Sequence, residues 1–310
     1  MLYRFRDHLR RALFARRCGD VYRTASVRID FGSNTAVLSQ LQHKDVLLYL
    51  LAIKSIARYL PLGAAYIVDD GSLTTNDRAL VAEHVPSVQF IALATFRSAA
   101  CPQGGTWERL LSIAELIKKH YVIQLDSDTL TIAAIPEVVQ CAADGRSFTI
   151  GTWDNQRIES MAERVAHAKT LPHSEGAHVQ VVAEAHFDRL NEFQNLNYVR
   201  GCSGFAGFAP GAFTKEFVEE ISQQMSAAIG ERWSEWGSEQ VMSNIVVANA
   251  PGSIVLPHPR YADCQKMQLG RTAFVHFIGS CRFNNGVYAR LGADVIQSLK
   301  AADAENRQHG

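Results

Sequence analysis

The chain has no apolar run long enough to cross a lipid bilayer as a helix, which takes about 20 residues. Its longest such run extends only from Val46 to Ile53. The N-terminus is basic, but it lacks the continuous apolar core of a signal peptide. These absences predict a cytoplasmic protein, with any membrane contact confined to the inner surface.

Cysteine is sparse, and its spacing shows no pairing. None of the six cysteines belongs to a Cys-x-x-Cys motif. They are Cys18, Cys101, Cys141, Cys202, Cys264 and Cys281. Disulfide frameworks are typical of small secreted chains, and zinc sites need closely spaced ligand pairs. We therefore expect these thiols to be reduced.

Net charge is absent as well, because 31 Lys and Arg residues balance 31 Asp and Glu residues. A balanced charge gives no overall attraction to nucleic acid, so we expect no nucleic-acid partner. Hydrophobic residues make up 47% of the 310 residues, which is ordinary for a globular protein with a sizeable core.

The first part of the chain alternates between two hydrophobic periods. Strand patterns occur at 35–41, at 64–72 (ending in acids and a glycine turn) and at 88–93. Helix patterns occur at 45–60, at 76–84 and after Thr106, a plausible N-cap. This alternation predicts βαβ units and a mostly parallel sheet.

Residues 1–17 carry arginines together with apolar residues that recur at helical spacing. The apolar residues are Leu2, Phe5, Leu9, Leu13 and Phe14. Such a segment can lie on an anionic membrane surface as a basic amphipathic helix. It can equally be a solvated helix that packs on the domain through Leu9 and Leu13, and we favour this second interpretation.

A buried strand is expected at 121–125, and it is followed at once by Asp126 and Asp128. Ligands of α/β sheets gather at the carboxyl ends of the strands. Two adjacent carboxylates there repel each other unless a cation joins them, and oxygen ligands favour Mg²⁺ or Mn²⁺. The alternative is that the acids merely end the strand, and these residues alone do not decide between the two.

The later chain is less regular. A strand is expected at 147–151, and a helical insertion or a mobile flap at 154–195. The spacing of His167, His173 and His178 within that segment matches no compact zinc motif. The glycines within the apolar run 197–210 allow either close approach of a ligand or β-bulges.

Towards the C-terminus, helix patterns cover 213–229 and begin again at Ser238, and an apolar strand from Thr272 contains His276. The polar tail from Ala301 is expected to fray.

Several short motifs then occur in a fixed order along the chain. Asp126-Ser127-Asp128 is followed far downstream by His276-Phe-Ile-Gly279-Ser-Cys-Arg282. The accompanying motifs are Ile67-Val-Asp-Asp70-Gly71, Trp107-Glu-Arg109-Leu110, Cys202-Ser203-Gly204 and Glu239-Gln240. Together they resemble the motifs of the GT-A glycosyltransferases, in particular the retaining glycogenin-like and bacterial galactosyltransferase-like group.

The sequence departs from that group at four points. Phe283-Asn284 stands where the group usually has Pro-Trp. Arg282 stands where the group has Lys, and Glu239 stands where it has Asp. The acid that often follows the group's first strand is missing, with Gln42 or His43 nearby instead.

The resemblance implies a GT-A fold, in which a Rossmann-like, mostly parallel central sheet is flanked by helices and joined by a smaller antiparallel C-terminal part. It implies a basic extension at 1–30, one catalytic domain at 31–300 and a flexible tail at 301–310. Within the domain, 35–150 is expected to be the nucleotide-sugar half and 151–300 the acceptor half.

The same resemblance implies roles for individual residues. Asp126, Asp128 and His276 are expected to bind Mn²⁺ or Mg²⁺. Catalysis and acceptor contacts are expected from Glu239, Gln240 and Asp154. Donor contacts are expected from Arg109, Ser127, Asp70, Gln42, Ser203, Gly204, Gly279 and Arg282.

The expected activity is transfer of a sugar from a nucleotide-diphospho-sugar, expected to be a UDP-sugar, to a glycan or lipid-linked glycan with retention of configuration. Two alternatives stay open: a non-catalytic GT-A-like carbohydrate-binding protein, and a sugar-1-phosphate nucleotidyltransferase.

Overall fold

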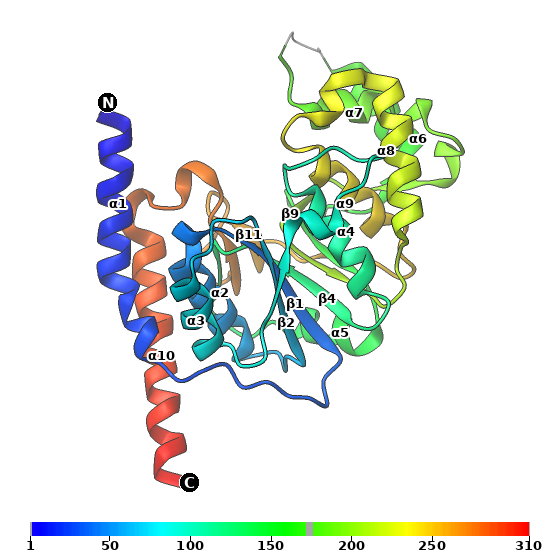
Figure 1. Cartoon of the computed structure of the whole chain (residues 1–310). Helices are drawn as coiled ribbons and strands as arrows, with labels where there is room; N and C mark the ends of the chain where they lie inside the picture. The colour runs from blue at the N-terminus through cyan, green and yellow to red at the C-terminus, as the bar shows by residue number, and fades with distance from the viewer. Residues whose placement is uncertain (1, 172–175, 310) are drawn as a thin grey trace. The chain divides into compact units, whose positions relative to one another are not determined.

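The computed structural model describes residues 2–171 and 176–309, and the chain divides into two compact units (Figure 1). The first unit comprises 1–90, 125–139 and 259–310, and the second comprises 91–124 and 140–258. These units cut across the expected halves, because 125–139 and 259–310 both return to the first unit. Each unit is described in turn.

The first unit contains parallel strands β1 (Thr35–Leu41) and β2 (Ala64–Asp69), in register from Ala36 opposite Ala64 to Leu41 opposite Asp69. Strand β3 (Gln89–Ala92) follows in the order β1-β2-β3. Helix α2 (Val46–Ala57) buries nearly every side chain, as its apolar residues on most faces predict. Helix α3 (Thr75–His84) completes the βαβ pattern expected from the sequence.

A second, smaller sheet of the first unit has the order β11-β12-β5. Its strands are β5 (Thr129–Thr131), β11 (Tyr261–Asp263) and β12 (Phe274–His276). Strand β12 is antiparallel to β5 but parallel to β11. The C-terminal part is therefore mixed rather than purely antiparallel.

The remaining strands of the seven-stranded principal sheet lie in the second unit, in the order β10-β6-β9-β4. They are β4 (Tyr121–Leu125), β6 (Phe148–Gly151), β9 (Gly201–Phe208) and β10 (Ile254–Leu256). Strands β10 and β6 are parallel, whereas β6 and β9 are antiparallel. The predicted α/β fold with a mostly parallel sheet is confirmed.

Packing against a neighbouring ring explains why β9 has a glycine at Gly207. A Cβ atom on Gly207 would lie 2.2 Å from Cε1 of Phe148, so no larger residue fits against that ring. The β6–β9 register also shifts between Thr149 and Ile150. The β-bulge, one of the two alternatives expected for this run, is present.

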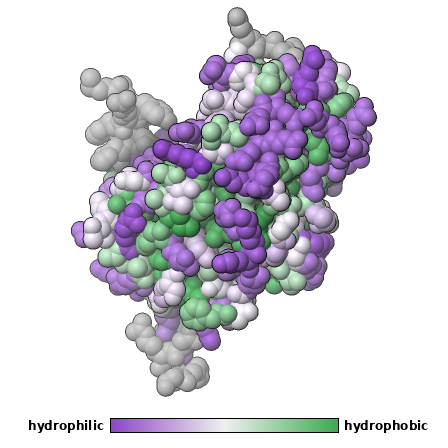
Figure 2. All heavy atoms as spheres, turned by 45° about the vertical axis from the view of Figure 1, so that its right-hand side comes forward, coloured by the Kyte–Doolittle hydropathy of each residue, from purple (hydrophilic) through white to green (hydrophobic). Residues whose placement is uncertain are grey.

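Helices cover the strands of the second unit. They are α4 (Trp107–Leu116), α6 (Met161–Thr170), α7 (Val179–Ala185), α8 (Lys215–Ile229) and α9 (Ser238–Asn249). Helix α5 (Pro136–Asp144) begins in the first unit and ends in the second, and β7 (Glu159–Ser160) pairs with β8 (Asn197–Tyr198). Figure 2 shows hydrophilic side chains gathered over the region of α6 to α8.

The described parts of the segment, 154–171 and 176–195, contain the helices α6 and α7, in keeping with the first of its two expected forms. Ser160 and Glu163 form a capping box that begins α6. His178 caps α7 through its ring nitrogen, and Nδ1 of His186 bonds to the carbonyl of Val182. His173 lies outside the described residues.

The two ends of the first unit are helical and lie side by side (Figure 1). Helix α1 (Leu2–Cys18) packs on α10 (Val287–His309) through Phe14, whose ring centroid is 4.7 Å from that of Tyr288. Leu9 and Leu13 are 49% and 57% exposed, so the expected packing through these two residues is wrong. The side chains of Leu2 and Phe5 lie outside the described residues.

The polar tail from Ala301 continues as helix α10 instead of fraying at once. Helix α10 is tied to the segment after α1, because Lys300 pairs with Asp20 at 2.6 Å and Asp303 accepts a hydrogen bond from the amide of Ala25. Among the residues described, no helix is both long and apolar enough to span a membrane.

Short 3₁₀ helices connect several of these elements. They are Gly19–Arg23, His43–Asp45, Leu93–Phe96, Phe187–Arg189, Phe193–Asn195, Gly230–Ser234, Gly279–Cys281 and Asn284–Gly286.

Candidate active site

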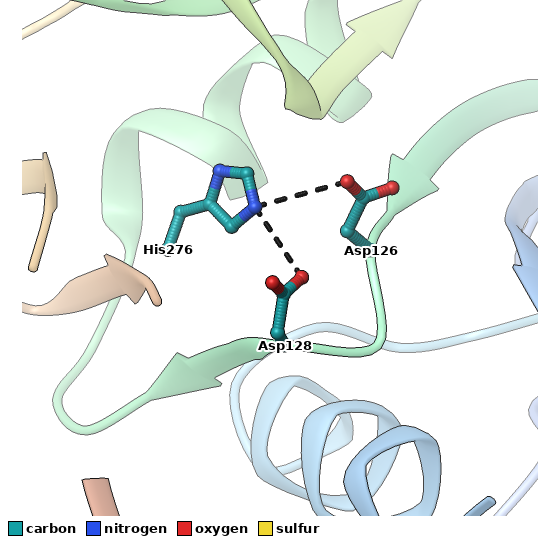
Figure 3. Close-up of side chains that lie close together, drawn as sticks. All are labelled: Asp126, Asp128 and His276. Atoms are coloured by element: carbon teal, nitrogen blue, oxygen red, sulfur yellow. Dashed lines mark ion pairs between the residues drawn. The ribbon is translucent and has the colours of Figure 1, made fainter. Parts of the chain in front are cut away.

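Two carboxylates and an imidazole converge where β4 turns into β5 (Figure 3). Asp126 and Asp128 directly follow β4, and Thr129 closes the turn by donating its hydroxyl to the carbonyl of Asp126 at 2.8 Å. His276 reaches the same place because β12 aligns it opposite Thr129. Its Nε2 lies 3.3 Å from Oδ1 of Asp128 and 3.7 Å from Oδ2 of Asp126.

These distances fit a shared cation. One ligand atom from each of the three residues lies within 4.8 Å of the others. Ligand atoms about 2.1 Å from an ion and at right angles around it are separated by about 3 Å, close to the spacings seen. Carboxylate oxygens with one imidazole nitrogen suit Mn²⁺ or Mg²⁺. The residues therefore fit the metal that the sequence predicts.

The surroundings of Asp128 favour its ionised, carboxylate form. Its burial opposes ionisation, but the neighbouring His276 and Arg282 outweigh the burial and keep the pKa of Asp128 below its ordinary value. A ligand carboxylate must be deprotonated to bind a metal, so Asp128 meets that requirement at neutral pH.

Arg282 lies directly against the acidic pair. Its Nη2 forms an ion pair with Oδ2 of Asp128, while its Nε donates to the carbonyl of Phe277 at 3.4 Å. The two oxygens of Asp128 are thus divided between His276 and Arg282. The predicted phosphate-binding arginine is at the site, positioned by a carboxylate.

The segment around His276 is fixed on both sides. The carbonyl of His276 accepts a hydrogen bond from the amide of Cys264, and the amide of Phe277 donates to the carbonyl of Asp128 at 2.8 Å. Gly279 has a φ of +37°, which lies in the left-handed region where glycine is least strained. The predicted glycine therefore serves the turn that leads to Arg282.

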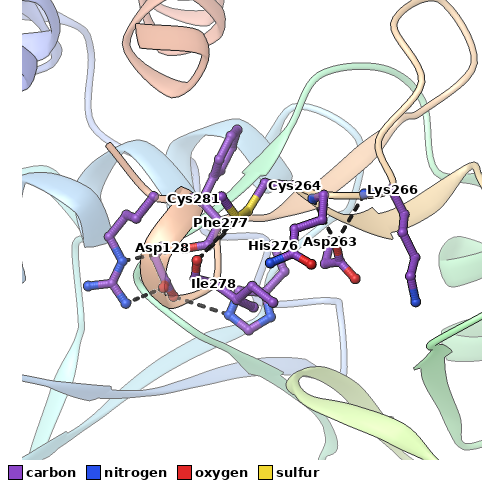
Figure 4. Close-up of a disulfide and its surroundings, with 10 residues drawn as sticks. Asp128, Asp263, Cys264, Lys266, His276, Phe277, Ile278 and Cys281 are labelled. Carbon is purple, nitrogen blue, oxygen red and sulfur yellow. Dashed lines mark hydrogen bonds and ion pairs between the residues drawn. A yellow bond between two sulfur atoms is a disulfide. The ribbon is translucent and has the colours of Figure 1, made fainter. Parts of the chain in front are cut away.

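A disulfide joins Cys264 to Cys281 beside this segment (Figure 4), so the expectation of six reduced thiols is wrong for these two. Strands β11 and β12 pair in parallel, and the Cα atoms of Cys264 and Cys281, which follow these strands, lie 6.3 Å apart. This distance is within the range that a disulfide bridges. A separation of 17 residues gives no sign of this proximity in the sequence. No disulfide joins the other four cysteines, all of which lie within the described residues.

Asp45, at the start of α2, is a further neighbour of the site. Burial raises its pKa, and the charge of Asp128 raises it further, against the opposing effects of Arg282, Lys44 and Arg11. Its Oδ1 lies 3.7 Å from Nη1 of Arg11. Helix α1 thus contributes a charge to the surroundings of the acidic pair, which no local motif indicates.

A separate polar cluster lies in the second unit, at the N-terminal ends of α4 and α9. Nη2 of Arg109 is 3.4 Å from Oε2 of Glu239, and both side chains are almost completely buried. The hydroxyl of Thr106 donates to the same oxygen at 2.7 Å, and the Trp107 indole donates to Ser238 at 2.9 Å. Two predicted site residues are therefore brought together.

Thr106 does not have the capping role predicted for it. Its φ is +76°, and its side chain forms no capping hydrogen bond with α4. The amide of Gly104 is bound instead by the carboxylate of Glu108, at 3.1 Å to each oxygen. The hydroxyl of Thr106 is used to hold Glu239.

The other predicted residues have local settings. Asp70 accepts hydrogen bonds from the amide and hydroxyl of Ser72, whereas the adjacent Asp69 is buried and paired with Arg78. Asp154 is exposed in a turn and accepts from the amide of Asn155.

Of the rest, Gln42, Ser127 and Gln240 are half-buried, while Ser203 and Gly204 are buried within β9. Their roles, and those of Asp70 and Asp154, stay predictions.

No protein-family model and no curated protein matches this chain. Among solved structures, the bifunctional glycosyltransferase WbbM is similar with a TM-score of 0.51 and 13% sequence identity, over 87% of this chain and 53% of that chain. This chain thus spans about half the length of WbbM. The fold is that of the GT-A glycosyltransferases.

Two further solved structures are similar at lower scores. GlyE of Streptococcus pneumoniae TIGR4 has a TM-score of 0.49 and 11% identity, over 87% of this chain and 64% of its own. The galactosyltransferase LgtC, in complex with donor and acceptor sugar analogues, has a TM-score of 0.42 and 12% identity, over 85% of this chain and 96% of its own.

Proposed function

We propose that this protein is a metal-dependent glycosyltransferase that uses a nucleotide-diphospho-sugar, expected to be a UDP-sugar. The observation that carries the proposal is the convergence of Asp126, Asp128 and His276 on a GT-A fold. A strand end that merely carried polar residues would not bring a distant imidazole to within 3.7 Å of both carboxylates.

The chemistry of the site suits departure of a nucleoside diphosphate. Asp126, Asp128 and His276 would hold the divalent cation, which neutralises charge that develops on the diphosphate as the anomeric C–O bond breaks. Arg282 adds a guanidinium beside the same position, where it can orient phosphate oxygens. Interactions that strengthen as the leaving group gains charge lower the barrier.

Glu239 is proposed to act on the sugar side of the reaction. Its charge is balanced by Arg109 and its orientation is fixed by Thr106. A carboxylate held in this way can position an acceptor or stabilise an oxocarbenium-like centre. Gln240 and Asp154 are proposed as further acceptor contacts, with a glycan or lipid-linked glycan as acceptor and retention as the outcome.

Donor contacts by Asp70, Gln42, Ser127, Ser203, Gly204 and Gly279 complete the proposal.

The test of the proposal is turnover of the purified full chain. UDP-, GDP- and CMP-sugars are incubated with and without Mn²⁺, and release of the free nucleotide is measured. We expect Mn²⁺-dependent release from one class of donor, lost on Asp128→Ala. Release of no nucleotide from any donor, or equal release by the variant, contradicts the proposal.

A further inference from the structure

A cavity of about 630 Å³ lies in the first unit between helix α1 and the segment 282–289, outside the acidic cluster. We call it the α1 groove. It is of the size that binds small molecules in proteins. Of its lining residues, only Arg282 has a role in the proposed transfer reaction.

The charge lining the α1 groove is of one sign. Four arginines border it, namely Arg10, Arg16, Arg17 and Arg282, and no acidic residue lines it among the side chains that the structure describes. The chain as a whole is balanced, with 31 Lys and Arg residues and 31 Asp and Glu residues. The groove therefore favours an anion, and arginine is the side chain best suited to bidentate contact with phosphate.

Apolar side chains share the same lining. Leu13, Phe14, Phe283 and Tyr288 border the groove beside the arginines. Leu13 is 57% exposed, whereas Phe14 is turned inward against the rings of Phe283 and Tyr288. A small inorganic anion would leave this apolar surface in contact with water. An anion that carries a hydrocarbon chain would cover it.

The sequence of α1 places these groups on one face. Arg10, Leu13, Phe14 and Arg17 follow the spacing i, i+3, i+4, i+7 and therefore line the same side of the helix. Arg11 does not line the groove; its guanidinium pairs with Asp45 and lies 4.9 Å from the Phe283 ring centroid. Among the described arginine side chains of α1, Arg10, Arg16 and Arg17 line the groove, whereas Arg11 pairs with Asp45.

Arg282 belongs to both places. It lines the α1 groove and also pairs with Asp128. A phosphate in the groove would therefore lie beside the segment that carries the predicted metal ligand His276.

We propose that the α1 groove binds the phosphate headgroup of an anionic membrane lipid, with Leu13 against the start of the hydrocarbon chain. The combination of four arginines with an exposed leucine is complementary to such an amphiphile. Lipid binding does not require sugar transfer. A failure to bind vesicles can therefore be distinguished from a failure to release nucleotide from a sugar donor.

The test is sedimentation of the full chain with phosphatidylcholine vesicles, with and without phosphatidic acid. We expect binding only to the vesicles that contain phosphatidic acid. Removing Arg10 and Arg17 together, as Arg10→Gln/Arg17→Gln, is expected to weaken binding about thirtyfold. Leu13→Asp, at an exposed position that leaves folding intact, is expected to weaken it as well.

The matched control is Arg28→Gln/Arg189→Gln, which removes the same charge from two exposed arginines outside the groove. Its binding should stay within about threefold of wild type, because surface attraction falls off within a Debye length. Equal weakening by both double variants would indicate general attraction of a basic surface and overturn the proposal. Absence of binding to phosphatidic acid vesicles would also overturn it.

A second arm separates a lipid phosphate from a free one. Dihexanoyl phosphatidic acid is expected to displace the protein from vesicles at concentrations where inorganic phosphate does not, because only the lipid covers Leu13. Equal displacement by inorganic phosphate would mean a simple anion site and contradict the lipid assignment.

Discussion

At the scale of single residues, the protonation state of each acid in the site depends on the charges of its neighbours. Asp128 keeps a lowered pKa despite its burial because His276 and Arg282 lie against it. Asp45 is equally buried in the same surroundings, yet its pKa is raised. The difference between these two acids comes from their partners, since burial alone would raise both.

Replacing Asp128 with the nearly isosteric Asn tests its role as a ligand. The change removes one anionic oxygen donor, so we expect Mn²⁺ affinity to fall by at least about a hundredfold. Isothermal titration calorimetry of the purified chain measures this. Asp144→Asn, at a surface acid paired with Arg146, should leave affinity unchanged, and an equal loss there would count against the assignment.

The buried pair of Arg109 and Glu239 makes a prediction about stability. Glu239→Ala removes the carboxylate that balances the charge of the buried Arg109 guanidinium, so the free energy of unfolding should fall by about 3 kcal/mol. Urea denaturation measures the change. The double variant Arg109→Met/Glu239→Leu should recover most of it, and a loss as large as the sum of the single changes would rule out this explanation.

Lys54 predicts a dependence of stability on alkaline pH. Burial lowers its pKa from 10.5 to about 8, against the opposing effects of Asp303 and Glu83. Between about pH 8 and pH 10.5 the unfolded chain then binds more protons than the folded one, so stability rises with pH through this window. Below pH 8 both states are protonated and the contribution is constant.

The variant Lys54→Met isolates this effect. The difference in unfolding free energy between wild type and variant should change by about 1 to 3 kcal/mol across that window, with wild type gaining as pH rises. A difference that stays flat from pH 7.5 to 10.5 would show that Lys54 titrates normally.

At the scale of elements, pairing between strands that are distant in the sequence builds the site. Strand β12 aligns His276 with the turn after β4, and its pairing with β11 brings Cys264 to Cys281. The disulfide closes the segment that carries both His276 and Gly279. It should therefore fix the predicted metal ligand as well as the fold.

Removing that disulfide is expected to lower stability. A closed segment of this length contributes about 3 kcal/mol by restricting the unfolded chain. We expect dithiothreitol to lower the melting temperature of the wild type and to leave that of Cys264→Ser/Cys281→Ser unchanged. A wild-type melting temperature that does not respond to the reductant would mean that the bond contributes nothing in solution.

Local patterns predicted most of the elements well. The apolar runs that form β1, β2 and α2 predict from their own residues that these elements are buried. Asp126 and Asp128 likewise indicate the turn after β4. Packing between segments that are distant in the sequence has no such local pattern. Neither the disulfide nor the contact of Arg11 with Asp45 could be predicted, because each depends on tertiary approach.

The case of α1 shows the same limit. Its apolar residues predicted an interior face, but which of them point inward depends on the position of α10. Phe14 packs there, whereas Leu9 and Leu13 stay exposed. His276 and Arg282 were predicted only because a family resemblance supplied the long-range information that the residues themselves lack.

At the scale of the whole molecule, the proposal depends on the GT-A fold. The second unit consists of two segments, 91–124 and 140–258, that lie in the sequence between segments of the first unit. The first unit contains the predicted cation ligands and Arg282, and the second contains Arg109 and Glu239. We therefore expect cation binding in the first unit, independently of the pair Arg109 and Glu239 in the second.

The most direct measurement is a thermal unfolding series of the full chain with nucleotide-sugars, with and without Mn²⁺. We predict that one donor class with Mn²⁺ raises the melting temperature by about 5 °C at saturating concentration, that either component alone gives a smaller rise, and that Asp128→Asn abolishes the additional rise. No shift with any donor and Mn²⁺, or the same shift in Asp128→Asn, would contradict a nucleotide-sugar site at Asp126, Asp128 and His276.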